Sequence, residues 1–109
     1  MPTALTLDTA RSADGSLVLT ATGEIDLSNV EPFNQALIAA VAGADSDGDK
    51  MLIVDLTGVQ YLDSAAVNVL FPHAEHIRVI AQPSLVRIFD ISGLSELAAV
   101  EPCPPTADN

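Results

Sequence analysis

Asp63 and Ser64 carry a carboxylate and a hydroxyl group, two side chains that could take part in chemistry, and they lie next to each other at a predicted helix start. The pair stands directly before Val67, Leu70 and Phe71, which repeat with the spacing of a buried helix face. Serine and aspartate are favoured at helix N-termini because their oxygens accept hydrogen bonds from unpaired backbone amides. We therefore expect a helix to begin near Ser64 with its hydroxyl exposed, although capping alone would also account for the pair.

A serine hydroxyl becomes a strong nucleophile only when a nearby base takes its proton. The two histidines, His73 and His76, follow Pro72, and nine residues separate Ser64 from His73. At a rise of about 1.5 Å per residue, a helix would place Ser64 and His73 more than 10 Å apart, which excludes a direct hydrogen bond between them. The acidic loop over residues 43–49 lacks the closing glutamate of a calcium loop. No phosphate loop, GxSxG elbow or metal cluster is present, so the sequence does not predict an enzyme.

Asp55 is a second candidate for a reactive residue. It lies near the end of the apolar run from Met51 to Leu56, which predicts a strand buried on both faces. Thr57 and Gly58 then predict a turn. A receiver domain also carries a phosphate-accepting aspartate after a strand, but it needs an acidic pair after its first strand and a late lysine. The only lysine here is Lys50. Asp55 is alternatively a residue that accepts hydrogen bonds from the turn.

Composition limits the partners that this chain can bind. Its 109 residues suffice for one domain, and 15 acidic against 4 basic residues give a formal net charge of -11. Nucleic acid and anionic membranes are therefore not expected as partners, whereas a protein with a basic surface is. No apolar stretch reaches membrane-spanning length, and the single Cys103 cannot form an internal disulfide. The sequence thus predicts a soluble cytoplasmic protein.

The elements that must position these residues alternate along the chain. Residues 5–8 and 17–22 have the alternation of two strands, joined by a hairpin turn at Asp14-Gly15, and Gly23 ends the second. Ser28 to Glu31 has the spacing of a capping box and predicts the start of a first helix. That helix should present one apolar face, formed by Val30, Phe33, Leu37, Ala40 and Val41.

The second half of the chain continues the alternation. Pro72 should end or kink the helix that begins near Ser64. A strand over Ile77 to Ala81 precedes a helix that starts at Pro83, packs through Leu85, Ile88 and Phe89, and is capped by Gly93. Residues 97–100 predict a last strand. The folded domain should then span residues 3–101, and residues 102–109 should form a disordered, proline-rich tail.

Strands that alternate with helices after an opening hairpin predict an α/β domain with a mixed, mostly parallel sheet. Two separated segments also resemble a known family. The run Asp55 to Val67, DLTGVQYLDSAAV, resembles the signature of the STAS domain of bacterial anti-sigma factor antagonists, and Gly23 to Asp26 resembles that family's other recurring segment. The resemblance covers about residues 5–100. It departs at Ala65 and Ala66, where the family more often has a small hydroxyl residue and glycine.

The resemblance implies a fold whose helices pack mainly on one face of the sheet, and it implies a partner-switching function. In that family the protein binds an anti-sigma factor, often a serine kinase, and so frees a sigma factor. Phosphorylation of the serine that corresponds to Ser64 switches the binding off. ATP and magnesium would belong to the kinase, so this chain, expected to be a monomer, needs no cofactor. The residues expected at the partner-binding edge are Glu24, Asp26, Asp63, Ser64 and Ala65.

Two alternatives stay open at this point. One is a STAS module that scaffolds or oligomerises without phosphorylation. The other is a receiver-like domain that uses Asp55.

Overall fold

A five-stranded sheet forms the centre of the domain in the computed structural model, which describes residues 5–13, 15–46 and 51–103. The strand order is β1-β2-β3-β4-β5, with β1 and β2 antiparallel and every other neighbouring pair parallel. This confirms the mixed, mostly parallel α/β fold. The elements in chain order are β1 (Thr6–Arg11), β2 (Leu17–Ile25), α1 (Val30–Ser46), β3 (Leu52–Leu62), α2 (Ser64–Leu70), the 3₁₀ helix η1 (Phe71–His76), β4 (Ile77–Ala81), α3 (Pro83–Ser92), α4 (Leu94–Leu97) and β5 (Ala99–Pro102).

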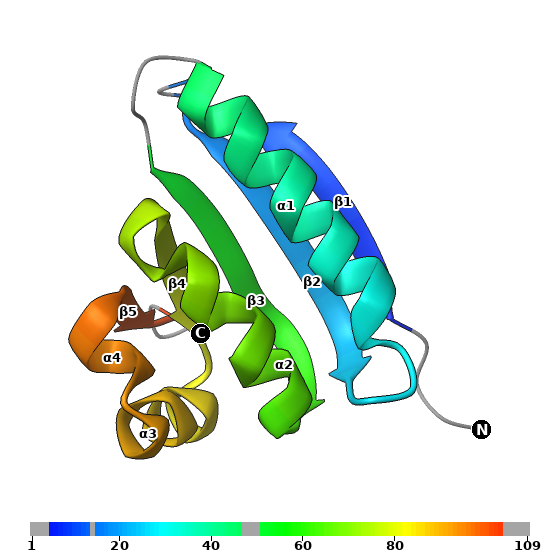
Figure 1. Cartoon of the computed structure of the whole chain (residues 1–109), viewed down its shortest axis with the longest axis vertical. Helices are drawn as coiled ribbons and strands as arrows, with labels where there is room; N and C mark the ends of the chain where they lie inside the picture. The colour runs from blue at the N-terminus through cyan, green and yellow to red at the C-terminus, as the bar shows by residue number, and fades with distance from the viewer. Residues whose placement is uncertain (1–4, 14, 47–50, 104–109) are drawn as a thin grey trace, which may run out of the picture.

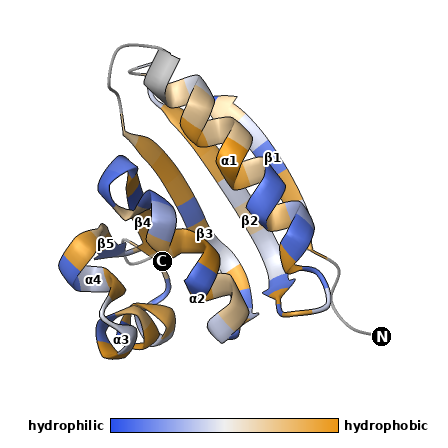
Figure 2. Cartoon of the chain, in the orientation of Figure 1, coloured by the Kyte–Doolittle hydropathy of each residue, from blue (hydrophilic) through white to orange (hydrophobic). Residues whose placement is uncertain are grey.

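The helices gather on one face of the sheet, as the resemblance implied (Figure 1). Side chains that alternate along the strands therefore differ in burial, because only one face is covered. The covered face and the helices share one apolar core, to which α1 contributes Phe33 and Leu37, α2 contributes Leu70, and α3 contributes Leu85 and Phe89. In Figure 2 the first half of β3, at the upper end of the view, is mostly hydrophobic, in agreement with its central position.

β3 is one continuous strand of 11 residues, so the predicted turn at Thr57 and Gly58 is wrong. The register against β2 shifts between Thr20 and Thr22, which marks a bulge. Position 58 at this bulge requires glycine, because a Cβ atom here would come within 2.4 Å of Thr22 Cγ2. Beyond Leu56, where the pairing with β4 ends, Gln82 Nε2 donates hydrogen bonds to the carbonyl oxygens of Thr57 (2.9 Å) and Val59 (3.2 Å).

Several other boundaries differ from the predictions. β2 does not end at Gly23 but continues to Ile25. α1 begins at Val30, and the Ser28 hydroxyl donates to Asp26 rather than forming the expected capping box. The hairpin forms between β1 and β2 with Gly15 in its turn, whereas Asp14 lies outside the described residues.

The C-terminal end carries more structure than the sequence predicted. The short helix α4 was missed, and β5 starts at Ala99, two residues later than expected. Pro102 pairs with Ala81 in the sheet, and the Cys103 amide donates to the Ala81 carbonyl at 2.8 Å. Residues 104–109 of the predicted tail lie outside the described part of the chain.

Pro72 acts largely as expected. The α-helix ends at Leu70, and the chain continues as the tighter helix η1 with Pro72 in its first turn. Phe71 nevertheless keeps helical backbone angles, contrary to the bias expected before proline. As predicted, α3 starts at Pro83 and is capped by Gly93. The cap has φ 91°, and its amide donates to the Asp90 carbonyl.

Candidate functional site

Asp63, not Ser64, caps α2. Its backbone is extended, and its Oδ1 accepts hydrogen bonds from the amides of Ala65 (2.9 Å) and Ala66 (3.4 Å). Ser64 is consequently the first residue of the helix, with an exposed side chain. Within the described part of the chain its hydroxyl has no hydrogen-bond partner. The capping role that could have explained Ser64 therefore belongs to its neighbour, and the hydroxyl remains accessible.

The loop between β2 and α1 is fastened to this helix start. The Asp63 amide donates to the Ile25 carbonyl at 3.2 Å, and the Leu27 amide donates to Asp63 Oδ2 at 3.1 Å. One carboxylate thus holds both the first turn of α2 and the loop beside it. The fold thereby brings the Gly23 to Asp26 segment and the Asp63-Ser64 pair together at one end of the sheet.

Asp26 organises the loop rather than presenting a bare charge. Its Oδ1 accepts hydrogen bonds from the Ser28 amide (2.9 Å) and the Ser28 hydroxyl (2.5 Å). These bonds, the hydroxyl first, lower the pKa of Asp26 below its usual value because they stabilise the ionised form. The carboxylate is therefore ionised at neutral pH and is already engaged inside its own loop.

Asn29, which was not among the predicted site residues, completes the loop. Its Oδ1 accepts from the Asp26 amide at 2.8 Å, while its Nδ2 donates to the Glu24 carbonyl at 2.9 Å. Asparagine commonly closes turns through such bonds, so the spacing of Asp26 and Asn29 in the DLSN run was the available signal. Glu24 itself is half-buried and pairs with Tyr61 in the sheet, and Ala65 is half-buried in the first turn of α2.

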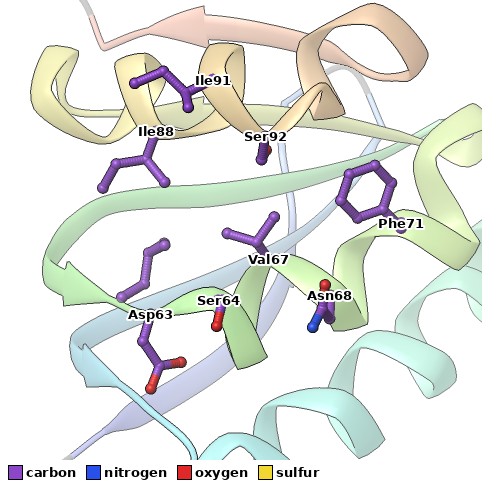
Figure 3. A pocket seen from close by; sticks show the side chains of 9 residues that line it. Asp63, Ser64, Val67, Asn68, Phe71, Ile88, Ile91 and Ser92 are labelled. Atoms are coloured by element: carbon purple, nitrogen blue, oxygen red, sulfur yellow. The ribbon is translucent and has the colours of Figure 1, made fainter.

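A groove of about 320 Å³ opens beside Ser64, between α2 and α3 (Figure 3). Figure 3 shows Ile88 projecting from α3 toward Val67 on α2, with Phe71 at one end of the groove and Ser64 on its α2 side. The Asp63 carboxylate points away from the groove, toward the loop that it holds. No sequence pattern indicated this groove. Helical spacing predicted that Ile88 lies in the core, but that side chain is 38% exposed.

Asp55 does not join this site. It lies in β3 seven residues before Leu62, about 23 Å along an extended strand. Its Oδ1 accepts from the Thr57 amide (3.0 Å) and hydroxyl (2.7 Å). Hydrogen bonds from nearby residues, one of the two roles that the sequence allowed, therefore account for this carboxylate.

The two histidines lie in η1, beyond the end of α2, and not beside Ser64. Partial burial, and then the nearby charge of His76, lower the pKa of His73. Among the described residues, no group of three or more His, Cys, Asp or Glu side chains is arranged to hold a metal ion. In the same part of the chain, no helix is both long and apolar enough to cross a membrane.

Comparison with known proteins gives a consistent result. The sequence model of the STAS domain family matches residues 9–107. The crystal structure of an anti-sigma factor antagonist from Mycobacterium paratuberculosis is similar, with a TM-score of 0.77 and 27% identity over 96% of this chain and 89% of that one. No curated protein sequence matches the chain significantly.

Two solved structures of SpoIIAA, which is less similar in sequence to this chain, share the fold. The unphosphorylated form of the anti-sigma factor antagonist SpoIIAA has a TM-score of 0.67 and 15% identity over 92% of this chain and 90% of that one. The phosphorylated form of SpoIIAA from Bacillus has a TM-score of 0.62 and 16% identity over 92% and 93% of the two chains.

Proposed function

Because the chain belongs to the STAS domain family, we propose that it is an anti-sigma factor antagonist whose binding is switched off by phosphorylation of Ser64. The observation that carries the proposal is the accessible Ser64 hydroxyl, which stands free at the first position of α2 because Asp63 supplies the cap. The similar protein from Mycobacterium paratuberculosis, an anti-sigma factor antagonist, supports the assignment to this class. The role is a binding role in the cytoplasm, and the chemistry belongs to the partner.

The unmodified protein binds an anti-sigma factor of the serine kinase type through the edge formed by Asp63, Ser64, Ala65 and the loop at Glu24 and Asp26. Occupation of that partner releases its sigma factor. The kinase later transfers the terminal phosphoryl group of ATP to Ser64 Oγ: the new O–P bond forms as the bond to ADP breaks, and the hydroxyl proton passes to a base of the kinase. The nucleotide and its magnesium ion are bound by the kinase.

Phosphorylation weakens binding through charge. A phosphoserine carries about -1.5 to -2 charges at pH 7. Asp63 already accepts hydrogen bonds from the Ala65 and Ala66 amides at the start of α2, so the phosphate can bind these two amides only by displacing that carboxylate. It therefore projects from an already acidic edge and meets the partner as an unpaired charge at a desolvating interface. The exposure of Ser64 lets the fold itself survive the modification.

The partner can be identified and the switch tested in one series of experiments. Wild-type and Ser64→Ala protein are used as bait in an extract of the source cell, and a captured protein counts only if it is a kinase that also binds a sigma factor. The purified partner is then titrated with wild type, Ser64→Ala and Ser64→Glu, and each is incubated with ATP. Ser64→Ala should bind but accept no phosphate. Ser64→Glu should bind at least about tenfold more weakly, or 1.4 kcal/mol.

Ser84→Glu is the matched control, because Ser84 is also exposed in the first turn of a helix but does not line the groove. It should bind like wild type. If wild type accepts no phosphate and Ser64→Glu binds as tightly as wild type, Ser64 is only a helix-terminal residue. A STAS module that interacts without phosphorylation then becomes the better account.

A further inference from the structure

One face of the sheet is left uncovered by the described part of the chain. The helices gather on the other face (Figure 1), although β2, β3, β4 and β5 run parallel and parallel sheets are as a rule covered on both faces. Burial alternates along β3 accordingly: Leu52, Val54 and Leu56 are fully buried, whereas Ile53 and Asp55 between them are only half-buried. The side chains of the uncovered face therefore border solvent.

The uncovered face is partly apolar. Val18 on β2, Ile53 on β3 and Ile80 on β4 lie on it, and each is half-buried. None of the three belongs to the apolar core of the described residues or to the side chains that pack against it. Val18 pairs directly with Ile53, and Ile80 lies one row further along the neighbouring strand. Adjacent apolar side chains on an open face indicate an interaction surface.

Carboxylates stand in the next row of the same face. The register aligns one residue from each of the five strands in this row: Asp8, Thr20, Asp55, Ile80 and Glu101. Neighbouring strands lie about 4.8 Å apart, so Asp8 and Asp55, which are two strands apart, are separated by about 10 Å. The row therefore places negative charges at a regular spacing beside the apolar residues.

Two of these charges have no counter-charge within the described residues. Glu101 is paired, because Arg78 Nε donates to its Oε2 at 2.7 Å. No lysine or arginine of the described residues forms an ion pair with Asp8 or Asp55. The Asp55 Oδ1 accepts the Thr57 amide and hydroxyl, which holds the carboxylate in place and leaves its Oδ2 for a further donor. The face thus offers two carboxylates to basic groups about 10 Å apart.

This spacing matches an α-helix. Residues i and i+7 of a helix project from the same side and lie about 10.5 Å apart along its axis. Basic side chains at these two positions would reach Asp8 and Asp55, and apolar side chains at i+3 and i+4 would lie between them, against Val18 and Ile53. A helix is also the element that covers the second face of most parallel sheets.

A second copy of this chain cannot supply such a helix from its described residues. Arg11 and Arg78 lie in strands, and Lys50 lies outside the described residues. Arg87 is the one basic residue in a described helix, and no other basic residue lies seven positions from it. A second copy would also bring the same formal net charge of -11, and molecules so charged repel one another. The occupant that fits is a different protein.

We propose that the uncovered face of the sheet docks an amphipathic, basic α-helix of another protein, whose basic side chains at i and i+7 pair with Asp8 and Asp55. Its apolar side chains cover Val18 and Ile53 and supply most of the affinity. The ion pairs are partly exposed and so contribute little affinity, but they fix the register of the helix on the sheet. None of these four residues lines the groove beside Ser64, so this surface does not depend on the proposed function.

The probe for the test is a synthetic, alanine-based helical peptide of about 18 residues, long enough to hold a helix, with lysines at i and i+7 and leucines at i+3 and i+4. A control peptide of identical composition carries the second lysine at i+5, on another side of the helix. Each peptide is titrated into the intact, ¹⁵N-labelled protein and followed by NMR. The probe should bind at least about tenfold more tightly than the control peptide, and the amide shifts should centre on Asp8, Val18 and Ile53.

Variants of the protein test the two ion pairs. Asp8→Asn combined with Asp55→Asn should bring the affinities of the two peptides within about twofold, while Asp55→Asn keeps an oxygen for the Thr57 bonds. The matched control is Glu31→Gln combined with Glu96→Gln, which changes the net charge equally at exposed positions of α1 and α4. It should keep the tenfold preference. Circular dichroism checks that each variant is folded.

Three results would overturn the inference. If wild type binds both peptides equally, net charge alone attracts them. If the double asparagine variant keeps the preference, Asp8 and Asp55 do not set the register. If the shifts centre on α2 and α3, the helix docks on the other face of the sheet. Because no anti-sigma factor or phosphorylation enters these measurements, their failure would leave the proposed function standing.

Discussion

Replacing Asp63 with alanine should destabilise the protein far more than replacing the adjacent Ser64. The Asp63 side chain accepts three backbone hydrogen bonds, two from the first turn of α2 and one from the Leu27 amide in the β2–α1 loop. The Ser64 hydroxyl accepts none from the described residues. Sequence preference alone would treat the two residues as equally good caps, so the comparison tests the geometry.

The expected magnitudes follow from these bonds. Loss of a helix N-cap costs about 0.5–2 kcal/mol of unfolding free energy, and loss of an ordinary hydrogen bond costs about 0.5–1.5 kcal/mol. Asp63→Ala should therefore cost about 1.5–3 kcal/mol. Asp63→Asn keeps an oxygen for the α2 amides but presents an NH₂ group to Leu27, and should cost about 1 kcal/mol. Ser64→Ala should change stability by less than about 0.5 kcal/mol.

Urea denaturation of the four proteins, followed by far-UV circular dichroism, measures these differences. In thermal unfolding, Asp63→Ala should lower the Tm by about 6–24 °C, given about 4–8 °C per kcal/mol for a domain of this size. Equal losses for Ser64→Ala and Asp63→Ala would refute the assignment of the cap. A loss for Asp63→Asn as large as that for Asp63→Ala would instead show that the bond to Leu27, not the cap, is the main contribution.

Two further predictions concern single features of the fold. Gly58→Ala should cost about 1–3 kcal/mol of unfolding free energy because its methyl group would meet Thr22, and Thr22→Ala in the same chain should recover part of the loss. An unchanged urea midpoint for Gly58→Ala would contradict this. Ser28→Ala should raise the pKa of Asp26 toward its usual value, as followed by NMR titration of the carboxyl carbon, since the Ser28 hydroxyl is the main cause of the lowered pKa. Because that pKa is lowered on folding, the ionised Asp26 stabilises the fold above about pH 4, and this contribution is lost as the pH falls through the lowered value. An unmoved pKa would show that the hydroxyl bond is not formed in solution.

The sequence predicted the start of α2 because its signals there are local. Asp63 and Ser64 lie between an apolar strand and a helical repeat, so the start of α2 could be placed from propensity alone. Pro72 limited the length of that helix for an equally local reason, the loss of a backbone donor. Even here the sequence could not choose between two adjacent capping residues. That choice depended on the Leu27 amide, which lies 36 residues away along the chain.

The continuous strand β3 shows why other features could not be predicted. Thr57 and Gly58 are ordinary turn residues, so the strand-forming residues before and after them, such as Val54 and Val59, could equally have belonged to two segments separated by a turn. The strand persists because Gly58 permits close approach to Thr22 in β2 and because Gln82 supplies a donor to the carbonyls of Thr57 and Val59. Both partners are distant in sequence, so tertiary contacts override the local preference.

Ile88 and Ile91 show the limit of helical periodicity as a guide to function. The pattern through Leu85, Ile88 and Phe89 predicts a buried stripe, but it cannot say how wide the covered stripe is. In the structure α3 packs mainly against α4 and β5, so its flank toward α2 borders the groove instead of entering the core. If Ile91 served stability, Ile91→Asp would lower the unfolding free energy. Its 82% exposure predicts the reverse, a fold whose stability is nearly unchanged by the substitution.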